Sequence, residues 1–159
     1  MMEYQIKKEA FPNFIGKISE DIVKKEFLEK GYNIHKCAKQ GRGKFGYFVY
    51  IDEKAILDFL KEYSGDKEKI LKLMKENRNG LPDFLVFNDK ELFFLEVKAR
   101  TKEKVKKYVE AISEKEVKKY SPFSENQEKT FNILRKEGYV IRWYHMKIIN
   151  RQLQSPTKK

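Results

Sequence analysis

Several features that would place a chain in a common class are scarce or absent in this sequence of 159 residues. Its single cysteine, Cys37, cannot form a disulfide within the chain, so we expect a reducing, cytoplasmic location. It has no apolar run long enough to cross a bilayer and no signal-peptide core, so we expect no membrane association. Its two histidines, His35 and His145, show no metal-ligand spacing with the cysteine, which argues against a zinc site.

Negative charge is also scarce relative to positive charge. The chain has 35 Lys and Arg against 24 Asp and Glu, a formal net charge of +11. Such an excess indicates either a lysine-rich solvated surface or a polyanionic partner, and cations that cluster around an acidic motif favour nucleic acid. A hydrophobic content of 40% and an aromatic content of 14% predict a folded chain, and the length predicts one domain with a real core.

That acidic motif lies on a predicted β-hairpin. Residues 84–87 and 92–95 are short, aromatic and apolar, and the residues between them are typical of a turn. If the hairpin is symmetric about the middle of its turn, Asp83 faces Glu96 with Cβ atoms about 5 Å apart. Lys98, two residues beyond Glu96, projects from the same face. Two adjacent carboxylates can hold a divalent cation, and a nearby ammonium can orient a water and stabilise anionic charge.

Pro82-Asp83 followed by Glu96-Val97-Lys98 resembles the signature of the PD-(D/E)XK nuclease superfamily, nearest to its VRR-NUC and archaeal Holliday-junction-resolvase members. The resemblance covers roughly residues 14–38 and 80–146. It implies an α/β fold, with a restriction-endonuclease-like core in which helices flank a mixed central sheet. It also implies a DNA endonuclease whose Mg²⁺ or Mn²⁺ is held by Asp83, Glu96 and the carbonyl of Val97, while Lys98 positions the attacking water. The alternatives are a turn role for Asp83 and an exposed strand position for Glu96.

Two further residues are candidates for the same site. Glu20 lies on the predicted first helix, which resembles the family helix whose glutamate often joins the metal site, and Asp21 and Glu26 are alternatives on that helix. Gln127 resembles a glutamine that follows the hairpin in several nuclease subgroups. Because Ser124 and Gln127 also have the spacing of a capping box, Gln127 can instead bind backbone at a helix start, and the two roles can coexist.

Periodicity predicts elements on both sides of the hairpin. Helices are expected over 14–30, 52–63, 67–77 and 124–137, strands over 32–38 and 139–149, helical spacing over 105–112, and a glycine-rich loop over 39–46. We expect residues 1–151 to form one nuclease-like domain, with 39–79 as a largely helical insertion that forms a clamp, a dimer face or core. Residues 152–159 are expected to be a flexible tail.

The candidates for nucleic-acid contacts are cations near the motif: Arg42 and Lys44 in the glycine-rich loop, and Arg100, Lys102 and Lys104 after Lys98. A solvated charged surface is the alternative for each of them.

The function classes left open are a Mg²⁺- or Mn²⁺-dependent DNA endonuclease acting on branched DNA, a nucleic-acid-binding module with little or no chemistry, and an assembly protein. The residues do not separate DNA from RNA. A homodimer is a reasonable expectation, because a two-fold axis arranges two-strand cleavage easily.

Overall fold

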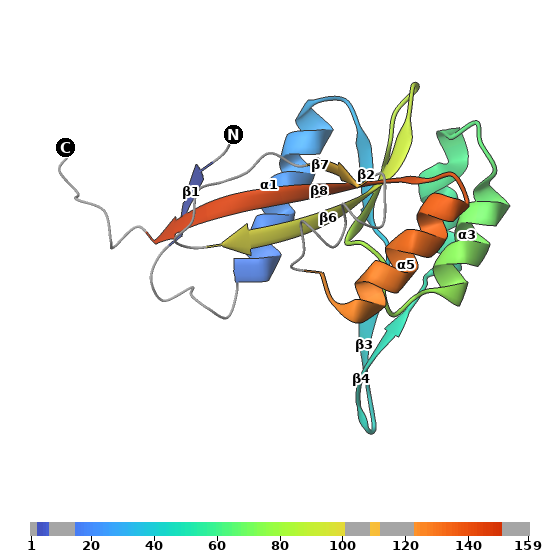
Figure 1. The fold of residues 1–159 in the computed structure, drawn as a ribbon, viewed down its shortest axis with the longest axis horizontal. Helices are drawn as coiled ribbons and strands as arrows, with labels where there is room; N and C mark the ends of the chain where they lie inside the picture. Colours follow the sequence, from blue (N-terminus) through green and yellow to red (C-terminus); the bar gives the residue numbers. More distant parts are fainter. Residues whose placement is uncertain (1–2, 7–14, 101–108, 112–122, 151–159) are drawn as a thin grey trace.

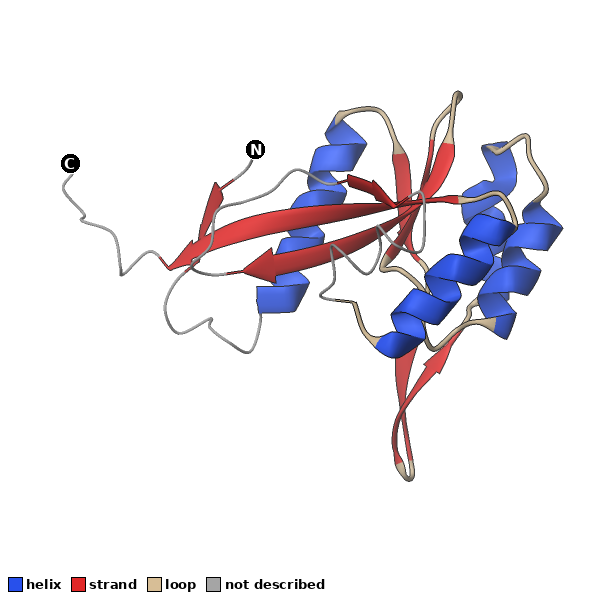
Figure 2. Ribbon diagram, viewed as in Figure 1, coloured by secondary structure: helices blue, strands red, loops and turns tan. Residues whose placement is uncertain are grey.

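A mixed β-sheet with helices on both faces forms the body of the protein (Figures 1 and 2). The computed structural model describes residues 3–6, 15–100, 109–111 and 123–150. The sheet has six strands in the order β1-β8-β6-β5-β2, with β7 also paired to β8. Its strands are β1 (Glu3–Ile6), β2 (Asn33–Lys36), β5 (Phe84–Phe87), β6 (Leu92–Arg100), β7 (Val109–Ala111) and β8 (Val140–Asn150). The expected α/β class with a mixed sheet is therefore confirmed.

Strand β6 lies in the middle of the sheet and carries most of the motif. It pairs in parallel with β8 and antiparallel with β5. Strand β5 in turn pairs antiparallel with β2, and β1 pairs in parallel with β8. The register of the β5–β6 hairpin places Phe84 opposite Leu95 and Phe87 opposite Leu92, which is the predicted register.

The two faces of the sheet carry separate apolar clusters because side chains alternate along each strand. Helix α1 (Ile15–Glu29) places Val23 and Phe27 on the face that includes Phe84 and Val86. Leu85 and Phe87 belong to the opposite face, with residues of three α-helices and a 3₁₀ turn. These elements are α2 (Glu53–Phe59), η2 (Leu60–Glu62), α3 (Lys67–Glu76) and α5 (Glu125–Lys136). All four residues of β5 are buried, as expected for a strand covered on both sides.

Helices α2 and α3 are part of the core. Asp52 and Asp66 cap the N-termini of α2 and α3 by accepting backbone N–H bonds, which is why both helices begin where the sequence indicates. Their apolar sides are buried against α5 and the sheet. Of the three roles that the sequence left open for this segment, packing is the one the structure displays.

Two of the predicted elements differ from the observed ones. The stretch expected to be a glycine-rich loop forms a two-stranded sheet of β3 (Lys39–Gly43) and β4 (Gly46–Tyr50), because the aromatic residues of β4 supply the side chains that β3 lacks. The helix that the spacing over 105–112 predicts is wrong at its C-terminal end, because Val109–Ala111 forms strand β7, which pairs with β8. Residues 101–108 and the expected tail, 152–159, lie outside the described residues. No helix in the described part of the chain has the length and apolar character needed to span a membrane.

The loop that leads to Asp83 lies directly against α5 at Gly80. A Cβ atom at this position would stand 2.5 Å from the backbone oxygen of Asn126, and it would also meet the side chain of Thr130. Only glycine allows this approach, because backbone of a helix cannot shift as a flexible side chain can. Gly80 therefore sets the distance between the loop that carries Asp83 and the helix that carries Gln127.

We predict that Gly80→Ala lowers the free energy of unfolding by about 1–3 kcal/mol, the usual range for overpacking. Urea denaturation followed by circular dichroism measures this difference. Gly43→Ala is the matched control, since its added Cβ would meet nothing closer than 3.4 Å. Equal stability of the two variants would contradict the close-packing role of Gly80.

Candidate functional site

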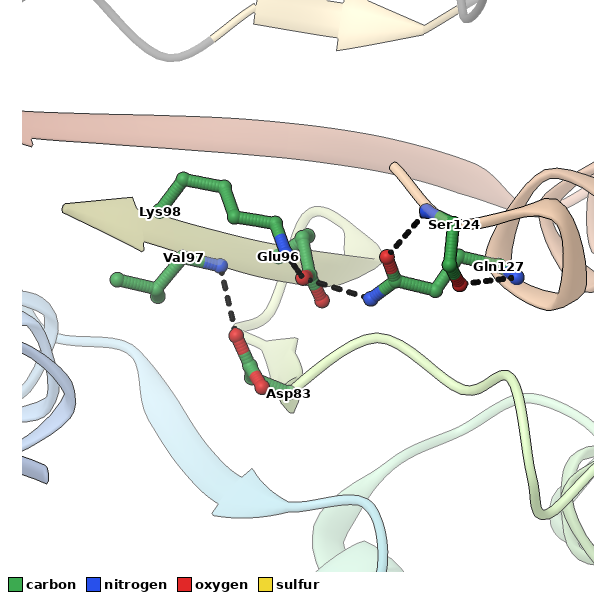
Figure 3. A network of polar contacts seen from close by, with 6 residues as sticks. All are labelled: Asp83, Glu96, Val97, Lys98, Ser124 and Gln127. Atoms are coloured by element: carbon green, nitrogen blue, oxygen red, sulfur yellow. Dashed lines mark hydrogen bonds and ion pairs between the residues drawn. The ribbon is translucent and has the colours of Figure 1, made fainter. Parts of the chain in front are cut away.

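Asp83, Glu96, Lys98 and Gln127 meet at the junction of β5, β6 and the start of α5 (Figure 3). Asp83 immediately precedes β5, and Glu96, Val97 and Lys98 are consecutive residues of β6. The observed pairing ends at Phe84 and Leu95, so Asp83 and Glu96 are the residues that directly follow the last pair at the open end of the hairpin. The sequence predicted this convergence from the turn position alone.

Asp83 is fixed by its neighbours on both sides. Its carbonyl oxygen accepts the backbone N–H of Cys37 at 2.9 Å, which extends the pairing of β2 with β5 by one residue. Its carboxylate oxygen Oδ2 accepts the backbone N–H of Val97 at 2.8 Å (Figure 3). The side chain of Asp83 therefore points across the hairpin toward the residue that follows Glu96, instead of into a turn.

Glu96 is the most deeply buried acid of the group, with 2% of its surface exposed. Its Oε2 atom accepts a hydrogen bond from Nε2 of Gln127 at 2.8 Å and lies 3.1 Å from Nζ of Lys98. Its Oε1 atom is buried, and within the described part of the chain no hydrogen-bond donor reaches it. The alternative of an exposed strand residue is wrong for Glu96.

Gln127 forms the capping box that its spacing from Ser124 predicted, and its side chain also reaches Glu96. Its Oε1 atom accepts the backbone N–H of Ser124 at 3.0 Å, and the Ser124 hydroxyl accepts the backbone N–H of Gln127 at 3.2 Å. The amide nitrogen of the same side chain is left to donate to Glu96. The capping box thus holds the amide in one orientation, and the helix start positions the carboxylate of a distant strand.

The environment of the two acids disfavours their ionised forms. Burial, with the negative charges of Glu96 and Glu20 nearby, raises the pKa of Asp83 from 3.8 to about 8. Burial also raises the pKa of Glu96, although the positive charge of Lys98 opposes the shift. The Cys37 thiol is buried beside them, and burial with these two acids raises its pKa well above the usual value. Cys37 has the packing role that the sequence indicated.

Glu20 lies near the acidic pair and bonds to a lysine. Its Oε1 atom is 2.5 Å from Nζ of Lys36, at the end of β2. That hydrogen bond raises the pKa of Lys36 against the opposing effect of its partial burial, which lowers it. Among the described residues, no three His, Cys, Asp or Glu side chains are grouped closely enough to hold an ion together. Lys36 was missed by the sequence reasoning, because nothing local indicates which residues β2 faces.

The donor set of the acidic pair fits a hard divalent cation. Mg²⁺ is held in proteins by one or two carboxylates together with waters, and Asp83 and Glu96 supply two carboxylates within one hairpin. The buried Oε1 atom of Glu96 has an unused acceptor position among the described residues. A cation at this place would also offset the repulsion that raises the pKa of Asp83.

Of the cations predicted to contact nucleic acid, the three that the structure describes lie on two separate elements. Arg42 lies in β3, and Lys44 lies in the turn between β3 and β4. Arg100 is the last residue of β6, where its backbone pairs with that of Lys147. Lys102 and Lys104 lie outside the described residues. The structure thus separates Arg42 and Lys44 from the hairpin and assigns them to the β3–β4 sheet.

Together these observations define an α/β protein in which a buried glutamate on the central strand of a mixed sheet lies beside a partly buried aspartate. No protein-family model matches the chain, and no curated protein and no solved structure matches it either. The case for a function therefore depends on the geometry and chemistry of the side chains themselves.

The raised pKa of Asp83 predicts an unusual dependence of stability on pH. The pKa of Asp83 is higher in the folded protein than in the unfolded chain, so its carboxyl group favours the folded state when it is protonated. This contribution to the free energy of unfolding is fully present below about pH 4 and is lost as the pH rises through about 8. Asp83→Asn removes this penalty and keeps an oxygen for the Val97 N–H. In chelator at pH 8, we expect the melting temperature of the variant to be about 3 °C or more above that of the wild type. At pH 5 we expect a smaller difference between the two melting temperatures.

Thermal melts of both proteins across this pH range measure the effect. Asp89→Asn, in the exposed turn of the same hairpin, is the matched control and should follow the wild type at every pH. A melting temperature for Asp83→Asn that stays below the wild-type value throughout would show that burial does not strain this carboxylate.

Proposed function

We propose that the protein is a metal-dependent nuclease that hydrolyses phosphodiester bonds in DNA, built on a restriction-endonuclease-like core. The observation that carries the proposal is the pair of a partly buried Asp83 and a buried Glu96, with the amine of Lys98 3.1 Å from the Glu96 carboxylate. Their order along the chain, Pro82-Asp83 and then Glu96-Val97-Lys98, is the order in the nuclease signature that the sequence resembles. Burying acids in this way destabilises a fold, so a functional role explains why they are there.

Hydrolysis of a phosphodiester requires that the negative charge on the phosphate be compensated, and it does not require a covalent bond between the protein and the substrate. Hydrolysis forms a bond between a water oxygen and phosphorus and breaks the bond from phosphorus to a bridging oxygen; the water loses a proton and the leaving oxygen gains one. A divalent cation, when bound, supplies positive charge at the phosphate and lowers the pKa of its water ligands. Asp83 and Glu96 would hold that cation, with the Val97 carbonyl as the further ligand that the resemblance implies.

Lys98 has the position needed to act on the water and on the developing negative charge. It projects from the same face of β6 as Glu96, because the two residues are one strand period apart. Its side chain is partly exposed, so its amine can reach a substrate that approaches from solvent. An ammonium group there orients the attacking oxygen and stabilises the extra charge on phosphorus. Gln127 keeps the Glu96 carboxylate in place and is a positioning residue.

The surface around the site suits a polyanion. A cleft of about 540 Å³ lies beside Gly80 and includes Lys75, Arg78 and Lys129 in its lining. A second cleft, of about 690 Å³, is bordered by lysines of α1, β2 and β3. With the net charge of +11, these clefts support nucleic acid as the substrate. Branched DNA is the particular substrate that the resemblance suggests.

The second candidate function is a nucleic-acid-binding module that has lost its chemistry. The observation that favours it is the hydrogen bond between Glu20 and Lys36, because a glutamate held by a lysine is less ready to join Asp83 and Glu96 around an ion. The complete set of Asp83, Glu96 and Lys98 favours the nuclease. A cleavage assay separates the two functions directly.

We predict that Asp83→Asn and Glu96→Gln each abolish Mg²⁺- or Mn²⁺-dependent cleavage, because each removes a ligand charge, and that both variants still bind DNA. The assay uses labelled duplex, single-stranded, flap and four-way DNA with either metal and a chelator control. Asp89→Asn, which changes a surface charge of the same hairpin, should cleave like the wild type. Undiminished cleavage by either site variant would refute the assignment.

We also predict that Gln127→Ala lowers the cleavage rate about tenfold or more, as expected for losing a hydrogen bond to a charged group. Ser124→Ala is the matched control, because it weakens the same helix cap but leaves the Gln127 amide free to bond Glu96. Gln127→Ala should also shift the Mn²⁺ concentration that gives half-maximal cleavage, which a loss of helix stability alone would not do. Equal rates for the two variants would remove Gln127 from the site.

A further inference from the structure

Strands β3 and β4 form a two-stranded ribbon that is separate from the main sheet. The ribbon projects from the body of the protein at the bottom of Figure 1. Its pairing runs from Lys39 opposite Tyr50 to Gly43 opposite Gly46 at the tip. A strand of five residues spans about 17 Å, so the tip extends well beyond the surface that surrounds the ribbon's base.

The ribbon exposes aromatic side chains that a protein normally buries. Phe45 is 97% exposed, Tyr47 69% and Phe48 50%. Tyr50 is also exposed, so four of the six exposed large hydrophobic side chains in the described residues lie on this one ribbon. A concentration of exposed rings on a projecting element indicates a binding surface, since isolated exposed hydrophobics are normal but clusters are not.

Rings of the ribbon lie on both of its faces, because the pairs Gly41–Phe48 and Arg42–Tyr47 occupy successive positions of the two strands. Phe48 crosses Gly41 on the facing strand so closely that a Cβ atom at Gly41 would be 2.5 Å from the ring. On the other face, the Arg42 guanidinium lies 5.7 Å from the centre of the Tyr47 ring. Glycine on one strand thus leaves room for a ring from the other, and both rings still have half or more of their surface exposed.

The charges of the ribbon identify the chemistry of its partner. Between residues 39 and 50 the sequence contains Lys39, Arg42 and Lys44 and has no acidic residue. A second copy of the same ribbon would bring like charges together, which disfavours self-association through this surface. A polyanion that also offers flat apolar surfaces matches both the cations and the rings, and nucleic acid with unpaired bases is such a ligand.

The base of the ribbon adjoins the acidic site. Strand β2 leads into the ribbon through Cys37, whose N–H bonds to the Asp83 carbonyl. The cleft of about 690 Å³ lies at this base and is lined by Lys24, Lys36 and Lys39, together with Tyr50 of β4. Lys36 is also the partner of Glu20. Lys39 in turn is paired with Asp52 at 2.9 Å, so the lysines of this cleft lie between the base of the ribbon and the surroundings of Asp83.

We propose that the ribbon binds the unpaired bases of a nucleic acid by stacking them on Phe45, Tyr47 and Phe48, while the phosphates follow the lysines of the cleft. The stacking itself does not require catalysis. The stacking implies a substrate class, namely a nucleic acid with a single-stranded segment beside the cleaved bond. This part of the inference rests on the proposed nuclease function. Double-stranded DNA alone is a poor ligand for this surface, because its bases are stacked on one another.

The first experiment uses the full chain in chelator, so that no cleavage occurs. Fluorescence anisotropy measures binding of labelled single-stranded and duplex DNA of equal length. We expect the double variant Phe45→Ala/Tyr47→Ala to lose about tenfold or more in affinity for the single strand, from the usual contribution of one stacked base, and to bind duplex like the wild type. Tyr47→Phe, which retains the ring, and Leu28→Ala, which removes an exposed side chain of α1, are the controls and should bind normally.

The second experiment is independent of affinity. Phe45→Trp places an indole at the tip, while the native Trp143 is buried. We expect single-stranded DNA to quench the new fluorescence and duplex DNA to leave it unchanged. Unchanged fluorescence with single-stranded DNA would overturn the proposal. Equal affinities of the wild type and the double variant for single-stranded DNA would also overturn it. A double variant that loses only its binding to anionic lipid vesicles would overturn it too, and would assign the rings to a membrane surface.

These outcomes are distinguishable from failure of the nuclease proposal. If the ribbon variants lose single-strand binding but the wild type cleaves no DNA with Mg²⁺ or Mn²⁺, the stacking surface is correct and the nuclease assignment is not. If the wild type cleaves and the ribbon variants keep the wild-type preference for a gapped duplex over an intact one, the nuclease assignment is supported and the ribbon has no part in selecting the substrate.

Discussion

The buried carboxylate of Glu96 is the constraint around which the centre of this protein is organised. A charged group with 2% of its surface exposed needs partners, since an isolated buried charge is very unfavourable. Lys98 provides the opposite charge from the same strand, and Gln127 provides a hydrogen bond from α5. Even so, the second oxygen of the carboxylate has no hydrogen-bond donor among the described residues. The site is thus held in shape but is electrostatically incomplete.

The fold holds the two acids at a fixed separation that local interactions could not maintain. Strand β6 is covered on both faces and paired on both edges, so Glu96 cannot move toward solvent. Asp83 is held by backbone bonds to Cys37 and Val97. The close contact of Gly80 with α5 fixes the loop before it. Rigid placement of like charges is a cost to stability, and it is the kind of preorganisation that a catalytic or ion-binding site requires.

Contacts between residues close together in the sequence could be predicted, whereas most contacts between residues far apart could not. The pairing of Asp83 with Glu96 followed from a short turn, and the capping box followed from the spacing of Ser124 and Gln127, because both are local. The contact between Gln127 and Glu96 was anticipated only through the family resemblance. The contact between Lys36 and Glu20 was missed, because it joins a helix to the next strand, and their sequence separation of 16 residues does not say which residues of α1 face β2.

Elements whose stability comes from a partner were the hardest to predict. Strand β3 has two glycines in five residues and no β-branched residue, so its own composition indicates a loop, and only Phe48 packed on Gly41 explains the ribbon. The short strand β7 and the N-terminal β1 exist through pairing with β8, which lies far away in the sequence. Propensity carries little information about such strands.

The most direct test of this account is a calorimetric titration of the metal-free protein with Mn²⁺ at neutral pH, repeated in buffers of different ionisation enthalpy. The account predicts that the wild type binds the ion and releases protons as it does so, because burial raises the pKa of Asp83 and of Glu96, and that Glu96→Gln gives no heat beyond dilution. Absence of binding to the wild type at millimolar Mn²⁺, or identical binding by Glu96→Gln, would contradict it.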